Sequence, residues 1–206
     1  VAPMLYFIGI LSVVITGLLS RRFDKHKEQN AFIMELPRYQ VPTLRNTWLQ
    51  TWERTRGFLI KAGTIILLAS AAIWILQSYS FAFKAVAPTD SMLASLGKVI
   101  APLFVPLGFG TWQASVALLT GIAAKESIVS TLSVTLGGAS VASLFTPHGA
   151  LAYMVFILLA SPCIAAISAM GKELGGGKKL AKALAWQTGF AYIMALLFNL
   201  LGMVIL

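Results

Sequence analysis

Residues 111–137 constrain this chain most, because they combine the length of a membrane crossing with two adjacent charges at the centre. The stretch is apolar apart from Lys125 and Glu126, with Gly121 before the pair and a run of hydroxyl residues, beginning at Ser127, after it. A charged side chain in hydrocarbon costs several kcal/mol, so it requires a partner or a function. The pattern predicts a helix that breaks at membrane depth and lines a transport path, where broken helices are tolerated.

A plainer interpretation of the same stretch stays open. It would be an ordinary transmembrane helix in which Lys125 and Glu126 pair with each other or with a neighbouring helix. The two interpretations differ in whether the backbone is interrupted near the charges.

The composition indicates a membrane protein. Of the 206 residues, 58% are hydrophobic and 11% are charged, whereas a soluble domain is about 25% charged. Mean hydropathy is +0.82. We therefore expect an all-α fold, a polytopic helical membrane protein with broken or re-entrant helices in a single transmembrane domain over residues 1–206.

The net charge of +9 could suggest nucleic acid, but the positions of the basic residues argue against such a partner. Nine of the sixteen Lys and Arg lie in residues 21–61, and four more lie in 172–182. Basic residues that flank apolar spans determine topology and contact anionic headgroups. The expected partner is the lipid bilayer.

The apolar runs predict five spans and two further elements. A run with prolines at 102 and 106 makes 90–110 a re-entrant candidate, in which Asp90 would cap a helix. Tryptophans 48 and 52 predict an interfacial helix at about 46–57. The spans lie at about 2–20, 58–79, 111–137 (broken), 150–170 and 183–206.

The positive-inside rule predicts that loops 21–57 and 171–182 face the cytoplasm. Loops 80–98 and 138–149 are poor in Lys and Arg and would face outward. Residues 99–137 must then return to the side that they left, which agrees with a re-entrant or broken element.

Three further features concern possible sites. Ser161, Pro162 and Cys163 lie at mid-span, where the proline should free a carbonyl near residues 156–157 and kink the helix. His148 lies alone in a loop, where a solvated histidine is more usual than a metal ligand. The basic loop 171–182 lacks the G-x-x-x-x-G-K-[ST] pattern, so we reject a nucleotide site there.

Four motifs resemble the C-terminal membrane half of bacterial ferrous iron transport protein B, the FeoB family. They match in order along nearly the whole chain. The motifs are ELPRYQVPTL at 35–44, TWERTRGFLIKAGT at 51–64, WQASVALLTGIAAKESIVSTL at 112–132 and SPCIAAISAM at 161–170.

The resemblance implies part of a Fe²⁺ importer in the bacterial cytoplasmic (inner) membrane. By similarity, Glu126 and Cys163 would lie on the ion path as transient metal ligands, together with Ser127 and Ser161. Residues in supporting roles would be Lys125, Gly121, Pro162 and Trp112. No catalytic residue is expected, and Fe²⁺ would be the transported ion rather than a bound cofactor.

The family's GTP-binding domain and first gate motif do not occur in these residues, so we expect a truncated chain or one subunit of a split transporter. GTP and Mg²⁺ would bind only in that missing domain, and this chain would not be an enzyme. The expected partner is the N-terminal GTPase and gate half, in the same or a separate chain. A homo-oligomer with further copies of the chain stays open.

Two rival functions stay open at this point. The chain could form a gate-type transporter of another solute, such as a nucleoside, for which Gln113, Glu126 and Ser127 could bind the ring. It could also be a membrane scaffold that transports nothing, and substitutions at Glu126 or Cys163 would then alter only assembly or stability.

Overall fold

The structure is a computed structural model that describes residues 2–23 and 42–205. It confirms the all-α prediction, since the described residues form helices and an isolated antiparallel bridge between Tyr79 and Ala85, with no strand. Most of the 35–44 motif and Lys25 lie outside the described residues.

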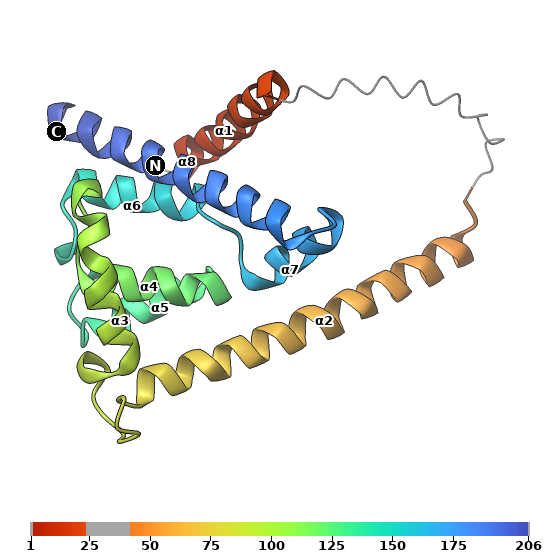
Figure 1. Cartoon of the computed structure of the whole chain (residues 1–206). Helices are drawn as coiled ribbons and strands as arrows, with labels where there is room; N and C mark the ends of the chain where they lie inside the picture. The colour runs from red at the N-terminus through yellow and green to blue at the C-terminus, as the bar shows by residue number, and fades with distance from the viewer. Residues whose placement is uncertain (1, 24–41, 206) are drawn as a thin grey trace. The chain divides into compact units, whose positions relative to one another are not determined.

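The structure divides into two units, Val1–Lys61 and Ala62–Leu206. Helix α1 (Ala2–Phe23) belongs to the first unit. Helix α2 (Leu44–Ser78) runs continuously from the first unit into the second (Figure 1). The backbone therefore has no interruption between the segments expected as an interfacial helix and as a span. At 1.5 Å per residue α2 is about 50 Å long, more than the roughly 30 Å hydrocarbon core of a bilayer.

Three short helical elements follow α2 in the second unit. The 3₁₀ turn η1 (Pro88–Asp90) leads into α3 (Met92–Ile100), and the 3₁₀ segment η2 (Ala101–Leu107) follows. The prediction that Asp90 caps α3 is wrong by one residue. Asp90 closes the preceding turn, and Ser91 caps α3 by accepting a hydrogen bond of 3.1 Å from the Ala94 N–H.

A sharp turn at Gly108 joins this segment to the central stretch. Gly108 has φ +82°, a left-handed conformation that suits glycine. The axes of Met92–Leu107 and Trp112–Ala123 differ by 103°. Thr111 caps the new helix α4 (Trp112–Ala123) through the Ala114 N–H.

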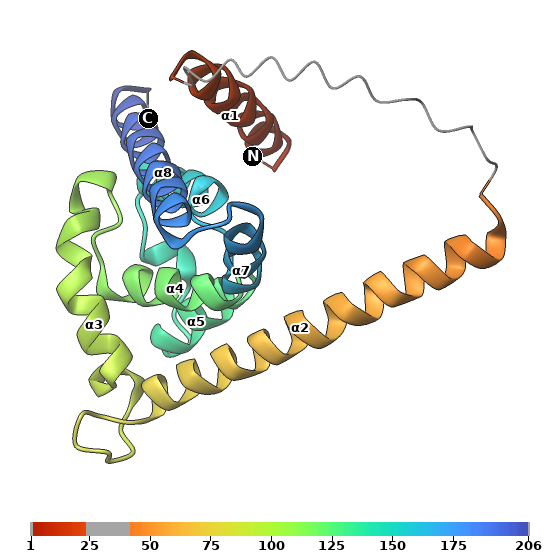
Figure 2. The same cartoon turned by 45° about the vertical axis from the view of Figure 1, so that its right-hand side comes forward.

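The central stretch is a helical hairpin. After α4 the backbone leaves the helix at Ala124, and α5 (Ser127–Thr135) folds back against α4 (Figure 2). The buried hydroxyls of Thr120 and Thr131 join the two arms at 3.0 Å. Helix α4 is about 18 Å long, roughly half of a bilayer core. The predicted broken helix is confirmed, and the hairpin geometry returns the chain in the direction from which it came.

The remainder forms a second interrupted helix and a long terminal one. Helices α6 (Pro147–Leu159) and α7 (Ile164–Glu173) follow the short turn η3 (Val141–Ser143), and α8 (Gly177–Ile205) ends the described chain. The prediction of a basic loop over the whole of 171–182 is wrong. Only residues 174–176 leave the helices, because α7 and α8 continue into the basic sequence.

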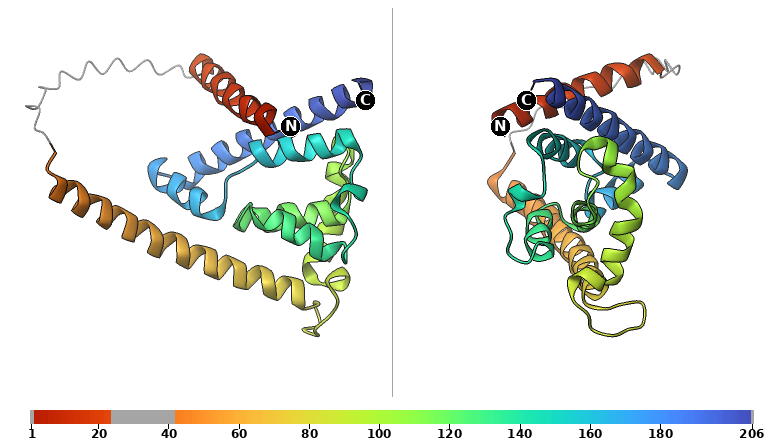
Figure 3. Two further views of the ribbon diagram at one scale, coloured as in Figure 1. Left: turned by 180° about the vertical axis from the view of Figure 1, so that it is seen from behind. Right: turned by 90° about the vertical axis from the view of Figure 1, so that its left-hand side faces the viewer.

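The core of the second unit lies where α4, α6 and α8 meet η2. Phe109 stacks on Phe104 at 5.4 Å and meets Tyr153 edge-on at 5.0 Å between ring centroids. Fully buried alanines, Ala152 on α6 with Ala191 and Ala195 on α8, belong to the same cluster, and α6 packs along α8 (Figure 3). Small residues allow such close helix approach in membranes.

By length and composition, three described helical segments could cross a membrane, or four if the bent pair counts as one span. The three are Leu44–Ser78, Pro147–Glu173 and Gly177–Val204. This number fits a multi-pass membrane protein.

Candidate functional site

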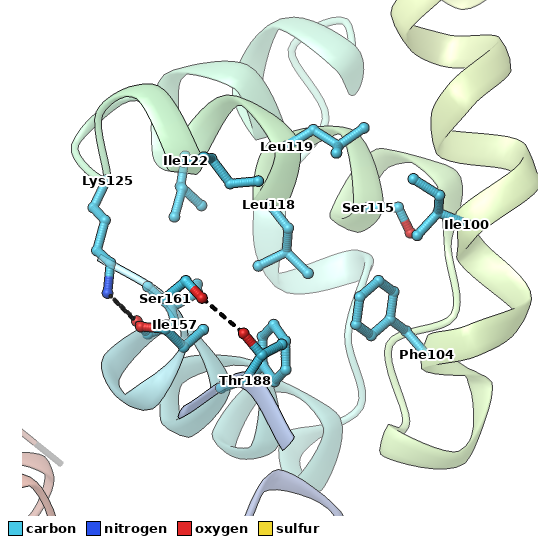
Figure 4. A pocket seen from close by; sticks show the side chains of 14 residues that line it. Ile100, Phe104, Ser115, Leu118, Leu119, Ile122, Lys125, Ile157, Ser161 and Thr188 are labelled. Carbon is cyan, nitrogen blue, oxygen red and sulfur yellow. Dashed lines mark hydrogen bonds between the residues drawn. The ribbon is translucent and has the colours of Figure 1, made fainter. Parts of the chain in front are cut away.

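Two helix interruptions lie next to each other. One is the hairpin tip at residues 124–126, and the other is the unwound segment 160–163 between α6 and α7. The Lys125 ammonium joins them by donating hydrogen bonds to the carbonyl oxygens of Ile157 at 2.8 Å and Ala160 at 3.4 Å. Figure 4 shows Lys125 reaching from the hairpin tip to the Ile157 carbonyl.

The sequence explains why these carbonyls are available. Helix α6 closes with the Ala160 N–H donating to Phe156 O at 2.7 Å. The next carbonyl, on Ile157, would need the N–H of Ser161, which lies beyond the helix end. Pro162 has no N–H to offer and disfavours helix at the residue before it. A cation at a helix C-terminus satisfies such carbonyls and complements the helix dipole.

The Ser127 hydroxyl binds backbone carbonyls at the C-terminal end of α4. The Ser127 Oγ donates to Ala124 O at 2.7 Å and lies 3.3 Å from Thr120 O. Ala124 itself is extended, with φ −153° and ψ 114°. Both carbonyls also accept backbone N–H groups, Thr120 O from Ala124 and Ala124 O from Ser127, so the hydroxyl adds a second hydrogen bond to each.

A cavity of about 190 Å³ lies beside the two interruptions. Three of the residues predicted for the site line it, namely Gly121, Lys125 and Ser161. Most of the remaining lining is apolar and comes from η2, α4 and α6 (Figure 4). The cavity is therefore mostly apolar, with Lys125, Ser161 and Thr188 together at one end and Ser115 at the other.

Two side chains of α8 complete the polar end. Thr188 shares a hydrogen bond of 2.7 Å with Ser161, and the Gln187 amide lies 3.5 Å from the Ala160 carbonyl. Sequence reasoning did not identify either residue. The available signal was weak: they are adjacent polar residues in an otherwise apolar span.

The structure does not bring every predicted residue to this cavity. Glu126 is exposed at the start of α5 and makes no capping hydrogen bond, and Cys163 is half-buried just before α7. Neither Glu126, Cys163, Ser127 nor Pro162 is part of the cavity lining. The shared polar cavity of Glu126 and Cys163 remains a prediction.

Trp112 lies at the other end of α4, about 18 Å from the hairpin tip. Its ring lies 5.8 Å from the Lys98 ammonium, a cation–π distance. His148 is in the first turn of α6, against Gly202 of α8. Both residues therefore pack against neighbouring elements at the first turn of their helices, away from the two interruptions.

The polar groups at the two interruptions are mostly neutral. Among residues 2–23 and 42–205, no three His, Cys, Asp or Glu side chains gather as a metal cluster. The groups that do converge at the interruptions are carbonyl and hydroxyl oxygens, gathered around the Lys125 ammonium. Neutral ligands of this kind suit transient passage, in which an ion must also leave.

Comparisons with known proteins agree with this geometry. Residues 2–54 match the family described as "Ferrous iron transport protein B C terminus", and residues 59–177 match the family described as "Gate: Nucleoside recognition". The chain belongs to the FeoB family, as its C-terminal membrane part. The Gate match covers both helix interruptions.

Several named relatives carry the same assignment. The "Fe(2+) transporter FeoB" of Staphylococcus aureus is 36% identical over 96% of this chain. The protein of that name from Methanocaldococcus jannaschii is 34% identical over 96% of it, and the one from Salmonella typhimurium is 42% identical over 63%. The chain spans 31% of the first two relatives and 17% of the third. No solved structure matches the chain.

Proposed function

We propose that this chain forms part of the Fe²⁺ path of a ferrous iron importer in the bacterial cytoplasmic membrane. The observation that carries the proposal is the meeting of two helix interruptions through Lys125 and the Ile157 carbonyl. Interrupted helices at membrane depth are the usual ion sites of transporters, because their free backbone groups can bind ions. The similarity to proteins named as Fe(2+) transporters is the reason for choosing Fe²⁺ as the transported ion.

In this proposal the ion contacts several weak ligands in turn. The exposed Glu126 carboxylate attracts the cation, and Cys163 with the hydroxyls of Ser127 and Ser161 offers ligands on the way. Fe²⁺ is intermediate in the divalent series and accepts oxygen, nitrogen and sulfur ligands. The chain itself catalyses no reaction and holds no resident cofactor.

The partner in this proposal is an N-terminal GTPase and gate half, in the same or a separate chain, where GTP and Mg²⁺ would bind. Its support is the coverage, since the chain accounts for 31% of the Staphylococcus relative. Homo-oligomers are compatible with this arrangement.

Nucleoside transport is the second candidate, because the Gate family is described by nucleoside recognition. The cavity argues against a nucleoside. Its lining is mostly apolar, with four polar side chains (Ser115, Lys125, Ser161 and Thr188), whereas a nucleoside requires hydrogen-bond partners around its base and sugar.

Uptake by cells that produce the complete transporter and lack other ferrous importers separates the candidates. Radiolabelled Fe²⁺ should accumulate, and excess unlabelled nucleoside should leave its rate unchanged. Nucleoside accumulation that Fe²⁺ does not inhibit would instead support the second candidate. Normal growth on iron with neither substrate accumulating would favour the scaffold interpretation.

A further inference from the structure

We propose that the carbonyl oxygens of Ile157 and Ala160, with the hydroxyls of Ser161 and Thr188, form a cation-binding site that Lys125 occupies as a tethered competitor. A divalent metal ion is the class of ligand that would replace it. The identity of that ion as Fe²⁺ rests on the proposed function, but the site itself rests on the contacts described below.

The first argument is the way in which the Lys125 charge is held. Its ammonium is half-buried and donates to two carbonyls of α6. Within the described residues no carboxylate forms a salt bridge with it, Glu126 included, and its hydrogen bonds go to neutral carbonyl oxygens. Neutral oxygens that can hold an ammonium have the same polarity as those that replace the hydration shell of a metal ion.

The second argument is the surrounding set of acceptors. Ser161 and Thr188 share a hydrogen bond of 2.7 Å at the same end of the cavity, and each hydroxyl has further lone pairs. Thr188 is exposed, so the described residues do not close this end of the cavity. A water molecule takes about 30 Å³ in the liquid, so the cavity of about 190 Å³ has room for a partly hydrated ion.

Competition follows from the geometry. A metal ion and the ammonium cannot use the Ile157 oxygen together, because both are positive and both require close approach to it. Entry of the ion therefore requires Lys125 to swing away from α6. If a site is open for only a fraction of the time, its apparent affinity is its intrinsic affinity multiplied by that fraction.

The test measures Mn²⁺ binding to the whole chain in lipid nanodiscs, by the loss of the free-ion electron paramagnetic resonance signal. Mn²⁺ prefers oxygen ligands and reports on the site without oxidation. Lys125→Met removes the competitor and keeps a long side chain. If the site is open for about a tenth of the time in the parent chain, the variant should bind Mn²⁺ about tenfold more tightly.

Two variants control this measurement. Lys98→Met removes a lysine of α3 that donates to Thr89 O and lies near Trp112 at the start of α4, so it should leave Mn²⁺ binding unchanged. Adding Ser161→Ala to Lys125→Met should abolish most of the gain. A folded Lys125→Met variant that binds Mn²⁺ no better than the parent chain would overturn the proposal and leave Lys125 as a helix cap.

A second measurement needs no variant, in case Lys125→Met fails to fold. The parent chain is treated with a membrane-permeant amine-acylating reagent, with and without Mn²⁺, and modified lysines are quantified by mass spectrometry. Mn²⁺ should raise acylation of Lys125 severalfold and leave that of Lys98 unchanged. Equal acylation of Lys125 in both conditions would contradict the displacement.

These outcomes are independent of the transport assay. Tighter Mn²⁺ binding by Lys125→Met together with absent Fe²⁺ uptake by the complete transporter would retain the site and reject the proposed ion. Normal Fe²⁺ uptake with no effect of Lys125 on metal binding would retain the function and reject the tethered competitor.

Discussion

The hydroxyl of Thr120 on α4 lies 3.0 Å from that of Thr131 on α5, although eleven residues separate them in sequence. Both side chains are buried. The Thr120 hydroxyl also lies 2.9 Å from Ala117 O, to which it donates, so the Thr131 hydroxyl donates to Thr120. This pair holds the two arms of the hairpin together just below the tip that carries Lys125.

The first prediction concerns this pair. Thr131→Val keeps the shape and β-branching of the side chain but removes the donor, and it should destabilise the protein by about 1 kcal/mol, typical of hydrogen bonds between membrane helices. Thermal unfolding in detergent micelles measures the change. Ser133→Ala, on the exposed side of α5, is the matched control and should have little effect. Equal melting temperatures for the two variants would contradict the role of the pair.

The hairpin shows how far the sequence could predict the site. The charges at Lys125 and Glu126 indicated a helix break, and the observed break lies within one residue of them. The sequence pattern predicts that Gly121 contributes to that break, yet it lies inside α4. Its role is close packing, since a Cβ there would lie 2.6 Å from the Ile128 Cδ1 atom. The folding back of α5 depends on this tertiary contact, which hydropathy does not encode.

The partner of Lys125 was beyond sequence reasoning for a similar reason. Proline chemistry predicted free carbonyls near residues 156–157, and the Ile157 carbonyl is indeed one of them. What the sequence could not predict is which side chain would reach it, because residues 125 and 157 lie on different helices. The interpretation in which Lys125 pairs with a neighbouring helix is therefore correct in part. Its other half, an unbroken helix, is wrong, because the backbone is interrupted at residues 124–126.

The second prediction concerns the turn before α4. Gly108 has φ +82°, and a Cβ on it would lie 2.5 Å from the Oδ1 atom of the fully buried Asn199. Gly108→Ala should therefore destabilise the protein by more than about 1 kcal/mol, through both backbone strain and overpacking. Gly189→Ala, at a helical position with open space around it, should be neutral or stabilising. Urea or thermal unfolding of both variants in detergent provides the comparison, and similar stabilities would refute the argument.

The third prediction concerns topology. Lys178 lies in the first turn of α8, in the basic segment expected to face the cytoplasm, and Lys84 lies in the exposed turn after α2. In a Cys163→Ser background, Lys84→Cys should react with an impermeant maleimide added to whole cells. Lys178→Cys should react only after the cells are permeabilised. Labelling of Lys178→Cys in intact cells would reverse the assignment.

The fourth prediction concerns the proposed ion path. Glu126→Gln keeps the size and hydrogen bonding of the side chain but removes the charge that attracts a cation, so Fe²⁺ uptake by the complete transporter should fall about tenfold or more. Since Glu126 is exposed and makes no capping hydrogen bond, the variant should insert and fold normally. Radiolabelled Fe²⁺ uptake at equal protein level measures the effect. Glu53→Gln, which alters an exposed carboxylate of α2, is the matched control.

Cys163→Ser should have a milder effect than Glu126→Gln, because a hydroxyl still offers an oxygen ligand to an ion that accepts both oxygen and sulfur. The half-buried position of Cys163 beside the unwound segment tolerates an oxygen of similar size. Parent-level uptake by both single variants and by the double variant would remove these residues from the path. Uptake that falls only in proportion to the amount of protein would instead support the scaffold interpretation, since the defect would then lie in assembly.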